Sequence, residues 1–196
     1  MRLRSCCCIA VDEDLSLGWH VSDSIKKVTI TNLKEQPPWI DTVALWHHQE
    51  WLNGRKLLNE CQTSRQHIDA KLDERKASLK RHMDNAPLPI TFIAHLDDLP
   101  LGSVSLVYYQ FVASAEQSEW LTNLYVVPTH RCKGIASTLL DHAQRYAHDI
   151  GLERLLLYTT DQANFYKKRG WITVNEGLVQ GHRVEILDYI INPLKN

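Results

Sequence analysis

The chain has 196 residues, of which 44% are hydrophobic and 23% are charged, and its formal net charge is −1. This length suffices for one domain with a substantial buried core. The nearly neutral charge gives no indication of a nucleic-acid partner, and no apolar run reaches the roughly 18 residues that a membrane helix needs. We therefore expect a globular domain without nucleic-acid or membrane partners, as a monomer or homodimer.

The first 24 residues differ from the rest of the chain. They show neither a helical nor a strand period, and their composition changes from basic through cysteine-rich to acidic. We predict a poorly ordered extension over 1–24, followed by one domain over 25–192. The chain holds five cysteines, three of them consecutive at 6–8. An odd number without an apolar signal segment argues against a disulfide framework and for the reducing cytoplasm.

The first half of the domain predicts a strand, two helices and a hairpin. Val28 and Ile30 alternate with threonines, as in a half-buried strand, and Gly54 follows an asparagine as a helix stop. Turn-forming residues at 97–100 separate two apolar runs. The predicted elements are a strand over 25–33, a helix over 39–52, a helix from Ser64, and strands over 89–96 and 101–110.

The stretch 119–150 reads as a strand, a tight turn and an amphipathic helix. The strand residues are bulky and β-prone, and Pro128 ends them. Apolar residues then recur at helical spacing from Ile135, and Gly151 ends the helix. This order predicts an α/β fold with a mixed sheet and helices on both faces. The remaining elements are a strand over 152–159, a helix over 162–169, and strands over 171–174 and 183–191.

The turn that begins at Arg131 has the features of an anion site. The first N–H groups of a helix lack partners within the helix, and the helix dipole favours negative charge there. Gly134 and Ala136 allow a phosphate to approach the backbone, and Lys133 adds positive charge. The spacing fits neither a phosphate-binding P-loop nor the dinucleotide-binding GxGxxG pattern.

Arg131, Gly134 and Ala136 fit the pattern Arg/Gln-x-x-Gly-x-Gly/Ala, and a second motif follows at 164–171 (NFYKKRGW). Together they resemble the GCN5-related N-acetyltransferase superfamily, over roughly residues 28–191. The resemblance implies the acyl-CoA N-acyltransferase fold, with a mostly antiparallel central sheet. It also implies transfer of an acetyl group from acetyl-CoA to a primary amine of a small molecule or peptide.

The resemblance also assigns roles to residues. Tyr166 occupies the family's general-acid position, where a phenol can protonate the departing thiolate. Glu119 is the candidate base, although it is one residue away from the family's usual position, and such a slip changes the sheet face unless a bulge restores it. Asn123 could hold a water instead. The implied acetyl-CoA contacts are Val126, Val127, Arg131, Cys132, Lys133, Gly134, Ile135, Ala136, Ser137 and Asn164.

The acceptor site is less well defined by the sequence. Trp46, His47, Glu50 and Trp51 could form an aromatic, partly acidic wall for a cationic amine, or the tryptophans could be core. The histidines do not have the spacing of a zinc site, so we expect no metal. Two alternatives stay open, namely an acyl-CoA-binding module without turnover and a transferase that uses another acyl-CoA.

Overall fold

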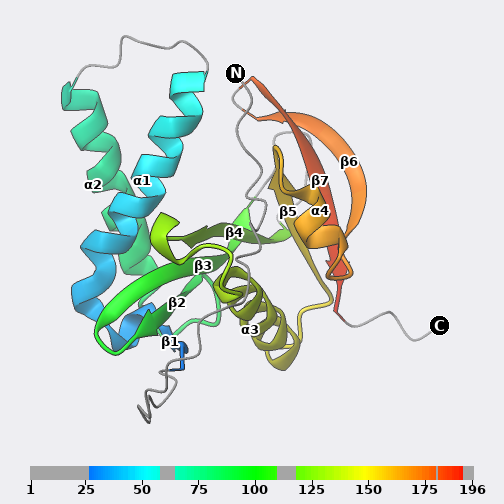
Figure 1. Cartoon of the computed structure of the whole chain (residues 1–196), viewed down its shortest axis with the longest axis horizontal. Helices are drawn as coiled ribbons and strands as arrows, with labels where there is room; N and C mark the ends of the chain where they lie inside the picture. The colour runs from blue at the N-terminus through cyan, green and yellow to red at the C-terminus, as the bar shows by residue number, and fades with distance from the viewer. Residues whose placement is uncertain (1–26, 58–64, 110–117, 180, 192–196) are drawn as a thin grey trace, which may run out of the picture.

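The computed structural model describes residues 27–57, 65–109, 118–179 and 181–191 (Figure 1). The predicted extension over 1–24 lies outside these residues. The described part contains one seven-stranded sheet with the strand order β1-β2-β3-β4-β5-β7-β6. β4 and β5 are parallel, and the other neighbouring pairs are antiparallel. The expected mixed, mostly antiparallel sheet is therefore confirmed.

The strands and helices alternate along the chain much as the sequence predicts. The strands are β1 (Thr29–Asn32), β2 (Ile90–Leu96), β3 (Leu99–Tyr109), β4 (Ser118–Val126), β5 (Arg154–Thr159), β6 (Ile172–Val179) and β7 (His182–Ile190). The helices are α1 (Ile40–Leu57), α2 (Arg65–Arg81), α3 (Ile135–Asp149) and α4 (Ala163–Lys167). Among the helices that the structure describes, none is both long enough and apolar enough to cross a membrane.

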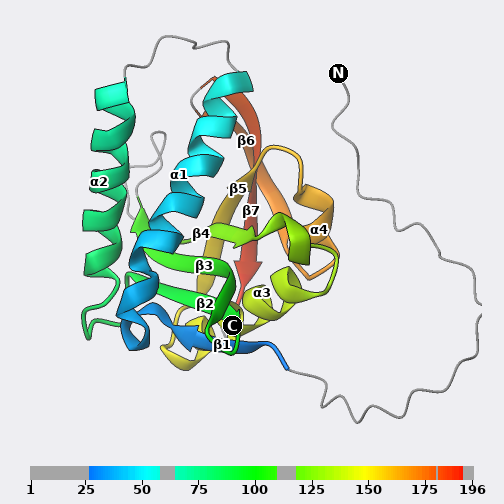
Figure 2. The ribbon, with the colours of Figure 1, turned by 60° about the vertical axis from the view of Figure 1, so that its left-hand side comes forward.

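The alternation of side chains along β2 shows how the two faces of the sheet are covered. Phe92 and Ala94 pack into the core beneath α3, together with Leu139 and Ala143 of that helix. Ile93, between them, packs into a separate core beneath α1 and α2. Figures 1 and 2 show α1 and α2 together on one side of the sheet and α3 on the other. Helices on both faces are thus confirmed.

Several predicted boundaries were wrong, and three of them have a clear physical reason. α1 continues through Gly54, because one glycine inside a helix costs only about 1 kcal/mol relative to alanine. β3 begins at Leu99, inside the predicted turn, because Asp97 adopts a left-handed φ of 50° and closes a shorter loop. β6 includes Gly177, which pairs with Val184, so the last hairpin turns later than predicted.

Gly102 allows β3 and β4 to approach each other closely. A Cβ at Gly102 would lie 2.5 Å from the carbonyl oxygen of Tyr125, a backbone atom that cannot retreat without separating the strands. We expect Gly102→Ala to lower the free energy of unfolding by about 1–3 kcal/mol, as overpacking does. Chemical denaturation measures this change. Wild-type stability in the variant would show that the two strands can move apart freely.

Candidate functional site

β4 and β5, the parallel strands at the centre of the sheet, separate after a short contact. Within the described residues, their ladder consists of Trp120 opposite Leu156. β4 also has a bulge, because its register against β3 shifts between Ser103 and Ser105. Asn123, in this bulge, has a left-handed φ of 54°. Since a bulge bends the strand that carries it, it accounts for the opening between β4 and β5.

A cavity of about 340 Å³ occupies this opening. β4 lines the cavity with residues 121–125, and β5 and its end line it with residues 157–160. α1 contributes His47 and Glu50, and α4 contributes Tyr166. The cavity thus brings together residues from α1, β4, β5 and α4.

Tyr166 is the predicted catalytic residue that lies in the cavity wall. Its ring packs edge-on against Phe165 and Trp171, with centroid distances of 5.1 and 5.9 Å. Burial raises the pKa of Tyr166 to about 12, and the negative charge of Asp161 adds to this effect. The phenol therefore keeps its proton at neutral pH and can donate it to a group in the cavity.

His47 connects α1 to the bulge. The hydroxyl of Ser103 donates a hydrogen bond to the carbonyl of Asn123 at 3.3 Å, so Nε2 of His47, 3.0 Å from Ser103 Oγ, is assigned as a donor to that oxygen. Burial lowers the pKa of His47 to about 3, and the charges of Arg75 and His82 add to this effect. The ring is therefore neutral at physiological pH and positions the bulge.

The turn before α3 lies next to the end of β4. Cys132 and Gly134 have left-handed φ values of 60° and 81°, and Lys133 between them is exposed. A Cβ on Gly134 would meet nothing within 4 Å, so the space outside the turn is open. Ile135, Ala136 and Ser137 form the first turn of α3, whose N–H groups have no partner within the helix. The geometry therefore suits an anion.

Arg131 connects this turn to the cavity. Its Nε donates a hydrogen bond to the carbonyl of Val126 at 2.9 Å. Its Nη2 lies 3.8 Å from Oε1 of Glu50, and its guanidinium lies 5.8 Å from the centre of the Tyr125 ring. One arginine thus contacts both the end of β4 and the acidic side chain in the cavity wall.

Arg169 is a further cation beside the turn, and it was not among the predicted site residues. Its Nη2 donates to Ser137 Oγ at 2.6 Å, and its Nη1 donates to the carbonyl of Phe165 at 2.8 Å. The guanidinium also stacks 3.9 Å from the centre of the Phe165 ring. The contact joins residues 32 positions apart, so no local pattern identifies it.

Four predicted site residues lie neither in the cavity lining nor in the turn before α3, namely Glu119, Asn164, Val126 and Val127. Glu119 lies in β4 before the strands part, and Asn164 is exposed on α4. The N–H of Val127 donates to the carbonyl of Leu101 at 2.9 Å, and the carbonyl of Val126 already accepts a side-chain hydrogen bond. The structure therefore brings Tyr166 to the cavity and leaves Glu119 apart from it.

The predicted acceptor wall divides into two parts. Trp46 is buried and packs against Tyr125, with ring centroids 5.2 Å apart, so it belongs to the core. His47 and Glu50 line the cavity. The side chain of Trp51 lies outside the described part of the structure.

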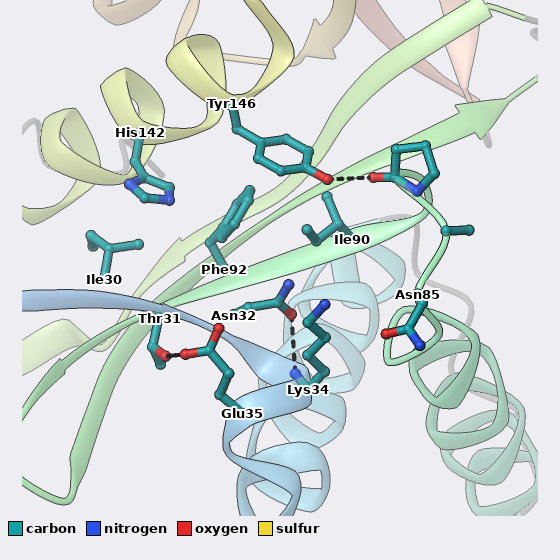
Figure 3. Close-up of a pocket in the computed structure, with 12 residues that line it drawn as sticks. Ile30, Thr31, Asn32, Lys34, Glu35, Asn85, Ile90, Phe92, His142 and Tyr146 are labelled. Carbon is teal, nitrogen blue, oxygen red and sulfur yellow. Dashed lines mark hydrogen bonds between the residues drawn. The ribbon is translucent and has the colours of Figure 1, made fainter. Parts of the chain in front are cut away.

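A second cavity, of about 460 Å³, lies between β1, residues 85–87 and α3. Figure 3 shows Phe92, His142 and Tyr146 along one side of it and Lys34 and Asn85 toward the other. Although it is larger, none of the predicted site residues lines it. We therefore place the candidate site in the cavity between β4 and β5.

Comparison with protein families gives a match over residues 51–171 to the Acetyltransferase (GNAT) family. Among curated proteins, the chain is similar to a thialysine N-epsilon-acetyltransferase from Caenorhabditis elegans, with 32% identity over 95 residues. That alignment covers 42% of this chain and 59% of the relative, so the chain matches less than two thirds of the relative's length.

Solved structures of this fold superpose on most of the chain. An aminoglycoside 6'-acetyltransferase type Ii has a TM-score of 0.61 and 17% identity, covering 84% of this chain and 98% of its own. A GNAT-family acetyltransferase from Streptococcus pneumoniae has a TM-score of 0.59 and 21% identity, and the alignment covers 85% of this chain and 100% of its own. The PaiA N-acetyltransferase from Thermoplasma acidophilum, solved in complex with coenzyme A, has a TM-score of 0.58 and 22% identity. The alignment covers 84% of this chain and 99% of its own. At these identities the likeness shows the fold.

Proposed function

The chain belongs to the acetyltransferase (GNAT) family, and on that basis we propose that it transfers an acetyl group from acetyl-CoA to the primary amine of a small molecule or peptide. The observation that carries this proposal is the cavity where β4 and β5 separate. A proton-bearing phenol, Tyr166, lies in its wall. The basic turn before α3 follows the end of β4 after a short 3-10 helix over Pro128–His130. The phenol can protonate a departing thiolate, and the turn can bind the phosphates of CoA.

The residues of the turn fit the diphosphate of CoA. Arg131, Lys133 and Arg169 supply positive charge, and the first-turn N–H groups of α3 supply donors. Gly134 leaves the approach open. Acetyl-CoA supplies the acyl group as an activated thioester when it is bound. We include in this proposal the acetyl-CoA contacts that the family resemblance predicts for Cys132, Val126, Val127 and Asn164.

Tyr166 is proposed as the general acid. Because burial raises the pKa of its phenol to about 12, the group is protonated throughout the physiological range and can donate its proton to the departing thiolate. The bulge at Asn123 places backbone groups at the cavity wall. Because N–H donors stabilise a developing oxyanion, we propose that a backbone N–H there serves the thioester carbonyl.

Removal of the amine proton does not require a carboxylate in the cavity. A free alkyl ammonium has a pKa of about 10.4, so a fraction of the acceptor is neutral at pH 7–8. Glu119 stays a predicted base, but its place outside the cavity lining favours the other route considered, in which water near Asn123 takes the proton. The rate of the reaction should then increase in proportion to the fraction of the acceptor amine that is neutral.

The acceptor that we propose to test first is a small molecule with a primary aminoalkyl group. The similarity to a thialysine N-epsilon-acetyltransferase supports this choice. A binding module that holds acyl-CoA without turnover is the second candidate, because the predicted base lies outside the cavity. A transferase that uses another acyl-CoA is a further alternative. We also propose that the protein is located in the cytoplasm.

An amine panel incubated with acetyl-CoA tests the function. We expect release of CoA thiol that depends on the amine and rises up to about tenfold per pH unit below the pKa of the amine, about 10.4. Detection of the thiol measures the rate, and propionyl- and succinyl-CoA in parallel test the acyl preference. Binding of CoA by calorimetry without amine-dependent thiol release would favour the binding module.

A further inference from the structure

We propose that Glu50 recognises the acceptor, and that the preferred acceptor carries a second positive charge besides the amine that is acetylated. This inference rests on the proposed amine acetylation and names its substrate class. Glu50 projects from α1 and is the acidic side chain among the twelve residues that line the cavity between β4 and β5. Among the residues that line the cavity, Glu50 therefore offers the one negatively charged group for a cation.

None of the other lining residues opposes this negative charge, and the cation beside it, Arg131, lies outside the lining. They are apolar, hydroxyl, amide or phenol side chains, together with His47. Burial lowers the pKa of His47 to about 3, so its ring carries no positive charge at neutral pH. Tyr125, beside Glu50, has an aromatic face of the kind that attracts cations. A positively charged group that enters meets one attractive charge and no like charge among the lining residues.

The chemistry of the reaction indicates which nitrogen Glu50 contacts. The attacking amine must be neutral, and a carboxylate beside it would favour its charged form. Such a contact would slow the reaction at that nitrogen unless the carboxylate itself removed the proton, a role proposed above for water near Asn123. A second ammonium keeps its charge throughout the reaction, so an ion pair with it stabilises bound substrate and transition state alike. Glu50 is therefore assigned to the group that does not react.

Arg131 provides a link between cofactor binding and this recognition. Its Nη2 lies 3.8 Å from Oε1 of Glu50, with the two side chains 50% and 54% exposed. An exposed pair at that distance is weak. Arg131 also belongs to the turn proposed for the diphosphate, whose negative charges compete for the same guanidinium. Binding of CoA is thus expected to release Glu50 toward the acceptor, so that acceptors bind more tightly after acetyl-CoA.

Three acceptors of equal chain length test the proposal: 1,5-diaminopentane, 5-amino-1-pentanol and 1-aminopentane. With saturating acetyl-CoA, the wild type should favour the diamine over both monoamines in kcat/KM by about tenfold, the size expected for a hydrogen bond to a charged group. The difference should lie mainly in KM. Glu50→Gln keeps the shape of the side chain without its charge. It should reduce the preference for the diamine to about twofold, which is the statistical factor for two equivalent amines. This loss is expected when the removed contact binds substrate and transition state equally.

Two further variants complete the test. Glu153→Gln removes the same charge from an exposed position before β5, outside the cavity lining, and should keep the full diamine preference. Glu50→Asp keeps the charge and should keep part of the preference. Turnover of all three acceptors with no preference in the wild type, or a preference that survives in Glu50→Gln, overturns this inference alone. Bound CoA with no turnover of any amine overturns the proposed function, and the inference with it.

Discussion

Tyr166→Phe is expected to lower kcat by at least about tenfold, because general acid catalysis contributes roughly 10²–10⁴-fold. The ring and its packing against Phe165 and Trp171 remain, so only the proton donor is lost. Affinity for acetyl-CoA should change little, since the phenol is proposed to act on the leaving group. Steady-state thiol release measures kcat, and calorimetry measures the dissociation constant of acetyl-CoA.

Tyr146→Phe is the matched control for this substitution. It removes the same atom from a tyrosine whose hydroxyl donates to the carbonyl of Pro87, beside the second cavity and outside the lining of the cavity between β4 and β5. We expect it to keep the wild-type kcat. A Tyr166→Phe enzyme that turned over at the wild-type rate would reduce Tyr166 to a packing residue.

The segment from β4 to α3 could be predicted because its signals are local. Bulky β-prone residues ending at Pro128 define the strand, and apolar residues at helical spacing define the face of α3 that is buried on the sheet. Gly134 and Gly151 flank the helix with left-handed φ values of 81° and 79°, which a glycine adopts without strain. The turn between strand and helix follows from these residues alone.

The cavity could not be predicted in the same way, because it depends on how strands pair. The bulge around Asn123 arises from the register between β3 and β4. Asparagine tolerates a left-handed φ, but its presence alone does not locate a bulge. The cavity also depends on the short contact between β4 and β5. Residue spacing indicates that a strand forms, but it does not indicate where two strands separate.

Side chains that reach the site from other elements also could not be predicted from residue spacing. From the sequence, Glu50 was predicted only as one member of a possible acceptor wall. Its ion pair with Arg131 bridges α1 and the turn before α3. Arg169 reaches Ser137 across 32 residues. Such contacts follow from tertiary packing, which a single sequence does not specify. The predicted base, Glu119, was chosen by its nearness in sequence to the central strand.

Gly134→Asp is expected to raise the dissociation constant of acetyl-CoA by at least about tenfold. A unit charge at about 4 Å from another costs roughly 1–4 kcal/mol between the dielectric limits of water and a protein surface. The new carboxylate would stand in the open space outside the turn, where the phosphates are proposed to bind. The effect should shrink as salt is added, because exposed charges are screened. Calorimetry at two salt concentrations measures both quantities.

Gly134→Asn is the matched control, because it adds a side chain of nearly the same size without the charge. Both substitutions place a side chain at a φ of 81°, a left-handed conformation that asparagine and aspartate tolerate better than other residues. Strain and bulk therefore contribute about equally to both variants, and the difference between their dissociation constants isolates the charge. If the two variants bound acetyl-CoA equally well, the diphosphate would have to lie away from the turn before α3.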